Sequence, residues 1–254
     1  MLKNKIVLIT GASSGIGTAC AEQFAAAGCK LLLCARRVDI INDLADTLQK
    51  KYHTKTHVFQ LDVRDHIAVI TQLAALPAPW KNIDILVNNA GLAAGLDLMQ
   101  DANMQDWEDM INTNIKGLLY MTREVLPQMI AKNSGHIVNI GSIAGHTTYP
   151  KGVVYCATKQ AVKTISEGLR MDLFGTKIRV SSVDPGAVET NFSHVRFKGD
   201  KARAASVYEG FEPLVANDIA DAILYCTTRP PHVNVSDIII MPTDQAAATM
   251  IARK

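Results

Sequence analysis

Short runs of apolar residues alternate along the chain with longer stretches in which apolar positions recur at helical spacing. Runs such as IDILV and DIIIM are apolar almost throughout, which is typical of strands covered on both faces of a sheet. The strands predicted on this basis are residues 5–10, 30–34, 56–61, 83–88, 136–140, 177–183 and 237–241. The predicted helices are residues 16–27, 38–51, 65–75, 103–131, 153–174 and 217–228.

This alternation predicts an α/β fold, with a doubly wound parallel sheet of about seven strands and helices on both faces. No linker, repeat or low-complexity tract interrupts the pattern, so residues 1–254 are expected to form a single domain. One segment departs from the pattern, because residues 186–217 are irregular and polar with scattered glycine and proline. A connection of this length often serves as a lid or binding loop, although a solvated insertion would have the same composition.

Composition and charge narrow the class of protein. Hydrophobic residues make up 48% of the chain and charged residues 20%, which provides material for a large core and argues against disorder. A net charge of +2 gives no indication of a nucleic-acid partner. The N-terminus lacks a signal peptide, and no apolar run approaches the roughly 18 residues of a membrane span. Five scattered cysteines without a C-x-x-C pair suit reduced thiols, so we expect a soluble cytoplasmic protein.

Residues 10–17, TGASSGIG, directly follow the first predicted strand and can be interpreted in two ways. The segment from Gly11 to Gly15 fits the G-x-S-x-G elbow of hydrolases, in which Ser13 would be the nucleophile. The same residues also form a glycine-rich turn from a strand into a helix, where the helix N-terminus binds a phosphate. The elbow follows a central strand, whereas the first strand-to-helix turn is the usual position for a nucleotide.

The spacing of the glycines allows a specific role for each of them. Gly11 permits a tight turn, Gly15 lets the backbone approach a phosphate, and Gly17 allows close packing of helix on strand. The spacing G-x-x-x-G-x-G differs from the dinucleotide fingerprint G-x-G-x-x-G, so a purely structural glycine turn stays open on this segment alone.

Further motifs follow in a fixed order, and with them the chain resembles the short-chain dehydrogenase/reductase family from residue 5 to about residue 245. The motifs include NNAG after the fourth strand and YCATK, which fits Y-x-x-x-K and begins 13 residues after a serine. The resemblance implies a single dinucleotide-binding and catalytic domain of the Rossmann type, in which residues 186–217 form the substrate loop. The catalytic residues it implies are Asn114, Ser142, Tyr155 and Lys159. The cofactor-binding residues it implies are Gly11, Ser13, Ser14, Gly15, Ile16, Gly17, Asp62, Val63, Asn89, Ala90, Gly91, Tyr155, Lys159, Pro185, Gly186 and Thr190.

Tyr155 and Lys159 can carry the proton chemistry because residues at i and i+4 share one helix face. A free tyrosine has a pKa of about 10, and a nearby ammonium or a positively charged nicotinamide is expected to lower it. Tyr155 would then act as general base in alcohol oxidation and as general acid in carbonyl reduction. Ser142 is expected to orient the substrate oxygen, and the resemblance implies that Lys159 also holds the nicotinamide ribose.

Asn114 falls on the apolar stripe of a predicted helix, so it is expected to be buried with hydrogen-bond partners. The resemblance implies that it anchors a water that relays protons from Lys159, whereas a core asparagine satisfied by local backbone would give the same pattern. Cys156 is adjacent to Tyr155 and points about 100° away on a helix, so we expect it to pack. The seven histidines show no metal-ligand spacing, and no metal is expected.

The end of the second strand indicates the cofactor. Enzymes that use NAD place an acid there on the adenosine ribose, whereas this chain has Ala35 followed by Arg36 and Arg37. Arginine binds a phosphate through two parallel hydrogen bonds, so the sequence predicts NADP(H), with both arginines reading the 2′-phosphate. The alternative is that the two arginines are only solvent-exposed residues at the start of the next helix.

Several stretches resemble the NADP-dependent 3-hydroxy acid dehydrogenases that oxidise serine and allo-threonine. They include residues 84–93, 116–127, 135–145 and 191–200, with shorter matches at 232–234 and 241–243. Within the predicted substrate loop, the short run of residues 196–203 carries a local charge of +3, which suits a small carboxylate and leads us to predict Arg196 as its direct partner, although a solvated basic loop is the alternative. This charge comes from Arg196, Lys198, Lys201 and Arg203 against Asp200.

The predicted reaction oxidises the 3-hydroxyl of acids such as L-serine, L-allo-threonine or 3-hydroxypropionate, or reduces 3-oxo acids such as malonic semialdehyde. Reduction of 3-oxoacyl thioesters or other ketones, a non-catalytic NADP(H) sensor, and hydrolysis at Ser13 remain as alternatives. No nucleic-acid or membrane partner is expected. The resemblance implies dimers or tetramers formed through the two long helices near 103–131 and 153–174, and a homotetramer is the state we predict.

Overall fold

The computed structural model describes residues 2–254 and is built on one seven-stranded sheet with the order β3-β2-β1-β4-β5-β6-β9. Every neighbouring pair of strands in this sheet is parallel. Each strand lies where the hydrophobic pattern predicts one, with ends that differ by at most two residues. The strands are β1 (Ile6–Thr10), β2 (Lys30–Ala35), β3 (Thr56–Gln60), β4 (Ile85–Asn88), β5 (Gly135–Ile140), β6 (Ile178–Pro185) and β9 (Asp237–Ile240).

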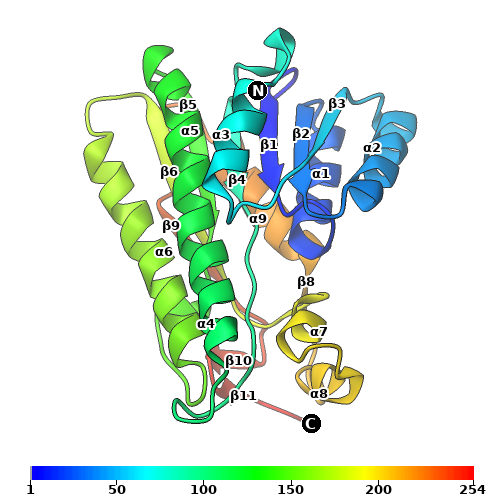
Figure 1. Ribbon diagram of the computed structural model, residues 1–254, viewed down its shortest axis with the longest axis vertical. Helices are drawn as coiled ribbons and strands as arrows, with labels where there is room; N and C mark the ends of the chain where they lie inside the picture. The colour runs from blue at the N-terminus through cyan, green and yellow to red at the C-terminus, as the bar shows by residue number, and fades with distance from the viewer. Residues whose placement is uncertain (1) are drawn as a thin grey trace.

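Helices cover both faces of the sheet, which confirms the predicted α/β fold class (Figure 1). One face packs against α1 (Gly15–Ala26), α2 (Val38–Tyr52) and α9 (Ala216–Thr228). The other face packs against α3 (His66–Ala74) and α5 (Leu118–Ala131), with α6 (Val153–Asp172) beside them. The central strands β1 and β4 are almost wholly buried, which explains why their sequences carry no polar alternation. None of the helices formed by residues 2–254 has the length and apolar character needed to cross a bilayer.

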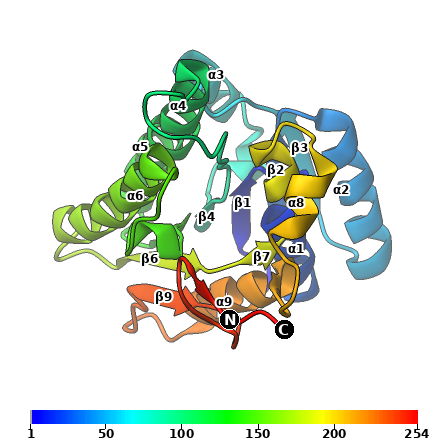
Figure 2. The ribbon, with the colours of Figure 1, turned by 90° about the horizontal axis from the view of Figure 1, so that it is seen from below.

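The functional crevice follows from the strand order. From β1 the chain runs outward to β2 and β3, then returns to β4 and continues in the opposite direction through β5 and β6. The connections after β1 and β4 therefore diverge, and ligands of open α/β sheets bind in the crevice that this divergence leaves at the carboxyl ends of the strands. Figure 2 views the molecule from this end of the strands.

The segment 103–131 is helical as predicted, but it is not one regular α-helix. It consists of α4 (Met104–Ile111), a π-helical turn η2 (Asn112–Gly117) and α5. At the end of this turn Gly117 packs against Val63, and a Cβ atom on Gly117 would lie 2.6 Å from a methyl group of that valine. Asn114 lies within the π turn, a kind of irregularity that is common at functional sites.

The segment 186–217 was predicted to be irregular, and this prediction is wrong in part. It contains two short helices, α7 (Phe192–Arg196) and α8 (Lys201–Ser206), and a two-stranded ribbon of β7 (Val188–Glu189) and β8 (Leu214–Val215). Elements of two to six residues carry too few positions to show a hydrophobic period.

The C-terminal segment packs on this region. The backbone N–H of Lys254 donates to the carbonyl of Gly210 at 2.7 Å, and the guanidinium of Arg253 donates to the carbonyl of Val207 at 3.0 Å. The hairpin formed by β10 (Gln245–Ala247) and β11 (Met250–Ile251) precedes these contacts. The tail therefore fixes the outer part of residues 186–217 to the body of the protein.

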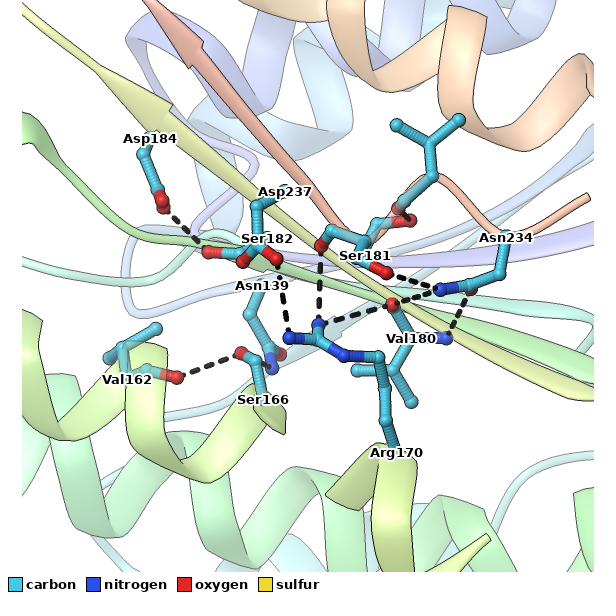
Figure 3. A network of polar contacts seen from close by, with 12 residues as sticks. Asn139, Val162, Ser166, Arg170, Val180, Ser181, Ser182, Asp184, Asn234 and Asp237 are labelled. Carbon is cyan, nitrogen blue, oxygen red and sulfur yellow. Dashed lines mark hydrogen bonds and ion pairs between the residues drawn. The ribbon is translucent and has the colours of Figure 1, made fainter. Parts of the chain in front are cut away.

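A buried polar chain holds α6 against the sheet. Asn88 donates to the side chain of Asn139 at 2.9 Å, and Asn139 donates to the hydroxyl of Ser166 on α6 at 2.9 Å. Ser166 in turn donates to the carbonyl of Val162 one turn earlier, as Figure 3 shows. These hydrogen bonds tie α6, the helix that carries Tyr155, to the strands β4 and β5.

Candidate active site

A cleft of about 790 Å³ opens at the carboxyl ends of the strands, on both sides of the β1–β4 crevice. It brings together segments from the glycine turn, the ends of five strands, the first turns of α6 and residues 186–217. Two of the predicted site residues, Gly17 and Asn114, lie behind its wall. The predicted residues that line it are Gly11, Ser13, Ser14, Gly15, Ile16, Arg36, Arg37, Asp62, Val63, Asn89, Ala90, Gly91, Ser142, Tyr155, Lys159, Pro185, Gly186, Thr190 and Arg196.

The glycine turn at the start of α1 needs glycine at all three positions. Gly11 and Gly15 have φ values of +65° and +54°, in the left-handed region that favours glycine. A Cβ atom on Gly17 would lie 2.4 Å from the carbonyl oxygen of Gly11, so that position accepts only glycine. The free N–H groups at the start of α1 follow this turn, which makes the turn a site for an anion.

The NNAG segment locks the turn in place. The hydroxyl oxygen of Thr10 accepts hydrogen bonds from the backbone N–H groups of Asn89 at 3.0 Å and of Ala90 at 2.9 Å. The side-chain amide of Asn89 donates back to the carbonyl of Thr10 at 2.9 Å and to that of Gly11 at 3.2 Å. Asn89 thus contributes to the cleft by holding the turn.

At one end of the cleft, β2 ends at Ala35 and is followed by Arg36 and Arg37. The guanidinium of Arg37 donates to the hydroxyl of Ser13 at 3.1 Å, so this cation lies against the glycine turn. Both arginines are exposed at the rim of the cleft, and the carboxyl end of β2 carries no acidic side chain. This arrangement suits a phosphate on the ribose, as the sequence predicts.

Asp62 and Val63 line the cleft beside these arginines, and the sequence analysis did not include the residue that orients Asp62. Arg64 contacts both carboxylate oxygens of Asp62, at 2.6 to 3.0 Å, and reaches Asp109 at 2.8 Å. Partial burial raises the pKa of Asp62, but the hydrogen bonds and charge of Arg64 outweigh it and hold the pKa below its usual range. The position of Arg64, two residues after Asp62, is the feature of the sequence from which this contact could have been predicted.

Tyr155, Ser142 and Lys159 meet at the other end of the cleft. The Nζ atom of Lys159 lies 6.0 Å from the ring centroid of Tyr155 and donates to the carbonyl of Ile140 at 2.8 Å. The hydroxyl of Ser142 accepts from the backbone N–H of Ala144 at 3.1 Å and donates to the carbonyl of Pro185 at 3.4 Å. The predicted groups are therefore gathered around one point of the cleft.

The pKa of Tyr155 differs in direction from the sequence-based expectation. Burial raises it above the ordinary value, and the neighbouring Tyr149 acts in the same direction. The hydroxyl of Ser142 and the charge of Arg196 oppose the rise without overcoming it. Burial also lowers the pKa of Lys159 to about 8, against the opposing charge of Asp184. The expectation that a nearby ammonium gives Tyr155 a lowered pKa is therefore wrong in its net direction, because desolvation dominates, whereas the expected effect of a positively charged nicotinamide stays a prediction.

The side chain of Asn114 is fully engaged with protein groups behind the cleft wall. Its Oδ1 atom accepts from the backbone N–H of Leu92 at 2.9 Å. Its Nδ2 atom donates to the carbonyl of Leu92 at 2.8 Å and to the hydroxyl of Thr158 at 3.0 Å. With both amide protons used, these contacts support a positioning role for the side chain, which joins the segment after NNAG to α6.

Arg196 is the basic residue of α7 that reaches the catalytic end. Its guanidinium lies 5.5 Å from the ring centroid of Tyr149 and 5.8 Å from that of Tyr155, and its Nε atom donates to the carbonyl of Gly95 at 3.2 Å. Its Nη2 atom is buried and has no hydrogen-bond partner among residues 2–254. A buried donor without an acceptor is costly, so the guanidinium of Arg196, a residue that lines the cleft, has unused hydrogen-bonding capacity.

The other basic residues of the predicted loop do not line the cleft. Lys198 pairs with Asp106 at 3.0 Å, and Arg203 stacks on Phe197 with 4.6 Å between guanidinium and ring centroid. Lys201 lies at the exposed start of α8. Only one of the four cations can therefore act on a ligand at this site. Tyr149, which packs against that arginine and lines the cleft, is a site residue that the sequence analysis missed.

The profile of the short chain dehydrogenase family matches residues 5–201. The chain belongs to this family. It is 46% identical over 244 residues to the NADP-dependent 3-hydroxy acid dehydrogenase YdfG of Shigella flexneri, which covers 96% of this chain and 97% of that protein. It is 45% identical to the NADP-dependent 3-hydroxy acid dehydrogenase of Schizosaccharomyces pombe over 254 residues, or 100% of this chain and 98% of that protein.

Solved structures agree with this membership. The closed form of a serine dehydrogenase complexed with NADP⁺ superposes with a TM-score of 0.91 at 44% identity, over 98% of this chain and 99% of that one. A serine dehydrogenase from Escherichia coli gives a TM-score of 0.83 at 42% identity, over 95% of this chain and 99% of that one.

Within this short-chain dehydrogenase, Ser13 and Cys156 lack the surroundings of nucleophiles. The hydroxyl of Ser13 accepts from Arg37, a permanent cation that cannot act as a base. Cys156 is fully buried in a cluster with Met110 and Ala93, and burial raises the pKa of its thiol. A serine elbow and a reactive thiol are both disfavoured by these contacts.

Proposed function

We propose that this short-chain dehydrogenase uses NADP(H) to oxidise the 3-hydroxyl of small hydroxy acids, or to reduce the matching 3-oxo acids. The observation that carries the substrate class is the buried, unpartnered Nη2 atom of Arg196 beside the ring of Tyr155. A free carboxylate on the substrate would accept from this nitrogen while the hydroxyl two carbons away reaches the tyrosine. The names of the full-length relatives in Shigella flexneri and Schizosaccharomyces pombe support the same activity.

The residues of the cleft divide the work of the reaction. The chemistry that bound NADP⁺ would supply is acceptance of a hydride from the carbon that bears the hydroxyl. Tyr155 takes the hydroxyl proton in oxidation and returns it in reduction, while Ser142 holds the substrate oxygen. The Lys159 ammonium stabilises the phenolate and holds the nicotinamide ribose, and Asn114 positions the helix that carries both groups.

The nucleotide is expected to lie along the cleft from β2 to β6. We propose that the glycine turn, with Ser13, Ser14 and Ile16, holds the pyrophosphate, and that Arg36 and Arg37 hold the 2′-phosphate. The other contacts between the protein and the nucleotide are proposed from the position of each residue along the cleft. Asp62 and Val63 would contact the adenine, Asn89, Ala90 and Gly91 the adjoining ribose, and Pro185, Gly186 and Thr190 the nicotinamide.

The charges around the catalytic end favour acids without a 2-ammonium group. The only acidic side chain that lines the cleft among residues 2–254 is Asp62, which lies at the adenosine end and is paired with Arg64. An ammonium group next to Arg196 and Lys159 would find two cations and no carboxylate. We therefore propose that 3-hydroxypropionate-type acids and malonic semialdehyde are better substrates than L-serine or L-allo-threonine.

A reductase of 3-oxoacyl thioesters is the alternative within the family, and Arg196 argues against it. A thioester has no free carboxylate, so its binding would leave the buried guanidinium nitrogen unpaired. A sensor without catalysis would require cofactor affinity but no acid and base, whereas Tyr155 and Lys159 both face the cleft.

A spectrophotometric panel at about 340 nm, the absorbance band of reduced nicotinamide, tests the proposal. It offers NADP⁺ or NAD⁺ with L-serine, L-allo-threonine, 3-hydroxypropionate and 3-hydroxyisobutyrate, and NADPH with malonic semialdehyde and a 3-oxoacyl thioester. Turnover of several free acids with NADP⁺, and none of the thioester, is the expected result. Thioester turnover without turnover of free acids would contradict the proposed substrate class and leave the family membership intact.

We further propose a homotetramer that forms through α4–α5 and α6. Apolar side chains on these helices and just after α6 are exposed, namely Leu119, Ile130, Val153, Met171 and Phe174. Light scattering on the purified protein would test this. The five cysteines are all free and buried, which suits a reducing compartment such as the cytoplasm.

A further inference from the structure

The carboxylate of Asp184 is buried next to the catalytic groups and has two donors. It is the penultimate residue of β6, directly before Pro185, and only 1% of it is exposed. Its Oδ2 atom accepts from Nε2 of His146 at 2.6 Å. Its Oδ1 atom accepts from the hydroxyl of Ser182 at 2.5 Å, a contact drawn in Figure 3.

The absence of a side chain at Gly141 leaves space for this carboxylate. A Cβ atom on Gly141 would lie 1.8 Å from Oδ1 of Asp184, so any other residue at position 141 would displace it. The backbone N–H of Gly141 donates to the carbonyl of Val183 at 2.9 Å, which continues the β5–β6 pairing up to the carboxylate. A buried carboxylate is costly unless it is paired. Gly141 leaves space for the Asp184 carboxylate, and Ser182 and His146 each contact one of its oxygens, so the surroundings of this group are specific to it.

His146 lies at the opposite end of a short turn from Ser142. The turn η3 (Ile143–Gly145) begins directly after Ser142, and the backbone N–H of His146 closes it on the carbonyl of Ile143 at 2.9 Å. Two contacts therefore join this turn to the end of β6. One is the 3.4 Å contact from the Ser142 hydroxyl to the Pro185 carbonyl, and the other is the 2.6 Å contact from His146 to Asp184. The second is short and charge-assisted, so it is the stronger of the two.

We propose that His146 and Asp184 are positioning residues for hydride transfer. Their contact fixes the turn that carries Ser142 against the segment Pro185–Gly186, so that the substrate oxygen and the nicotinamide keep a reactive distance. The inference rests on the proposed function, because it assigns Ser142 to the substrate and Pro185–Gly186 to the cofactor. A displacement of about 1 Å between reacting groups is enough to cost about 100-fold in rate.

Substitutions of His146 test the contact more cleanly than substitutions of Asp184. The titratable groups that face Asp184 are His146 from η3 and Lys159 from α6, so neutralising the carboxylate would also remove a charge that favours the protonated lysine. His146→Leu removes the donor and leaves the other neighbours in place. His146→Gln retains an N–H that can reach the carboxylate, and it serves as the conservative rescue.

His136→Gln is a matched control for the loss of a buried histidine. His136 also lies on the β5–β6 pair, and its Nε2 atom contacts the hydroxyl of Ser181 on β6 at 2.8 Å. It differs in position, because it lies at the amino end of β5 and does not line the cleft. This control separates loss of stability from loss of positioning.

The experiment measures kcat, KM, the Kd of NADPH by fluorescence, and the primary isotope effect with cofactor deuterated at the transferred hydrogen. The wild-type enzyme and its best acid substrate provide the reference. In His146→Leu we expect kcat to fall by about 10- to 100-fold, the isotope effect on kcat to rise, and the Kd of NADPH to change little. In His146→Gln most of kcat should return, and in His136→Gln kcat and the isotope effect should stay at wild-type values.

Other outcomes overturn the inference. A His146→Leu enzyme that is folded and retains wild-type kcat and isotope effect would show that the contact only stabilises the fold. A parallel loss of NADPH affinity, or the same kinetic change in His136→Gln, would show general disruption instead of positioning. The wild-type protein is assayed with hydroxy acids before any variant is compared. If it turns over none of them, the proposed function itself is wrong.

Discussion

The guanidinium of Arg196 lies 5.8 Å from the ring centroid of Tyr155, and the two side chains come from α7 and α6, 41 residues apart in sequence. This pairing sets the distance between the cation that can bind a carboxylate and the phenol that can move a proton. A substrate that bridges them must carry an acid and a hydroxyl a few bonds apart. The proximity of Arg196 to Tyr155 therefore limits the proposed substrates to small hydroxy acids.

Replacing Arg196 tests this connection directly. Arg196→Ala is expected to lower kcat/KM for hydroxy acids by about 10- to 100-fold, mainly through KM, because a hydrogen bond to a charged group contributes about 1.5–3 kcal/mol. Lys198→Ala is the matched control, since Lys198 pairs with Asp106 and does not line the cleft. Steady-state kinetics with both variants would decide. An unchanged KM in Arg196→Ala would remove this residue from the substrate site.

Replacing the arginines at the end of β2 tests cofactor choice. Arg36→Ala and Arg37→Ala should each weaken NADPH binding by about 10-fold or more and leave NADH binding nearly unchanged, because only NADPH carries the 2′-phosphate. Fluorescence titration with both nucleotides measures the effect. Arg37→Ala should be complicated by the loss of its contact with Ser13, so Arg36→Ala is the cleaner variant. Equal affinity of the wild-type enzyme for NADPH and NADH would contradict the assignment.

The pH dependence should have opposite signs in the two directions of the reaction. Burial raises the pKa of Tyr155, so the phenol is the resting form at neutral pH. Oxidation requires the phenolate and should become faster as pH rises, whereas reduction requires the phenol and should become slower. Profiles of kcat/KM in both directions would show this. Tyr155→Phe should abolish both activities and retain NADPH binding, and identical profiles in the two directions would rule out Tyr155 as the shared acid and base.

Lys159 should determine where the oxidation profile rises. Burial lowers the pKa of Lys159 to about 8, so its charge is lost as pH rises through this value. Lys159→Met removes this charge also below about pH 8, where the wild-type ammonium favours the phenolate, so the variant should lose most of its oxidation activity there and keep only the rise at higher pH that follows from Tyr155 itself. A profile of the variant that coincides with the wild-type profile would show that the lysine does not act on Tyr155.

A buried histidine away from the cleft should make stability depend on pH. Burial lowers the pKa of His136 from about 6.5 to about 3, so the folded state binds fewer protons than the unfolded state between these values. Stability is therefore lost as pH falls below about 6.5, by about 3 kcal/mol between pH 7 and pH 4. Urea unfolding of the wild type and His136→Gln at both pH values measures it, and the variant should show a smaller decrease. Equal decreases in both proteins would assign acid sensitivity to other groups.

The regular elements and the glycine turn could be predicted because their signals are local. Each strand of the main sheet is an apolar run long enough to recognise, and the glycines at 11, 15 and 17 meet backbone requirements within one turn. The π turn at Asn112–Gly117 was not predicted, and its last residue packs against Val63, a contact between distant segments that no local pattern shows. The short helices α7 and α8 were missed because five or six residues show no period.

The sequence by itself determined the strand and helix pattern, the family motifs, and the types of residue available for chemistry. Only the tertiary structure decided which of the four basic residues between positions 196 and 203 lines the cleft, that burial raises the pKa of Tyr155, and that His146 contacts Asp184. The physical reason is the range of the interactions. Periodicity and backbone geometry are properties of neighbouring residues, whereas desolvation and pairing depend on which distant segments the folded core places side by side.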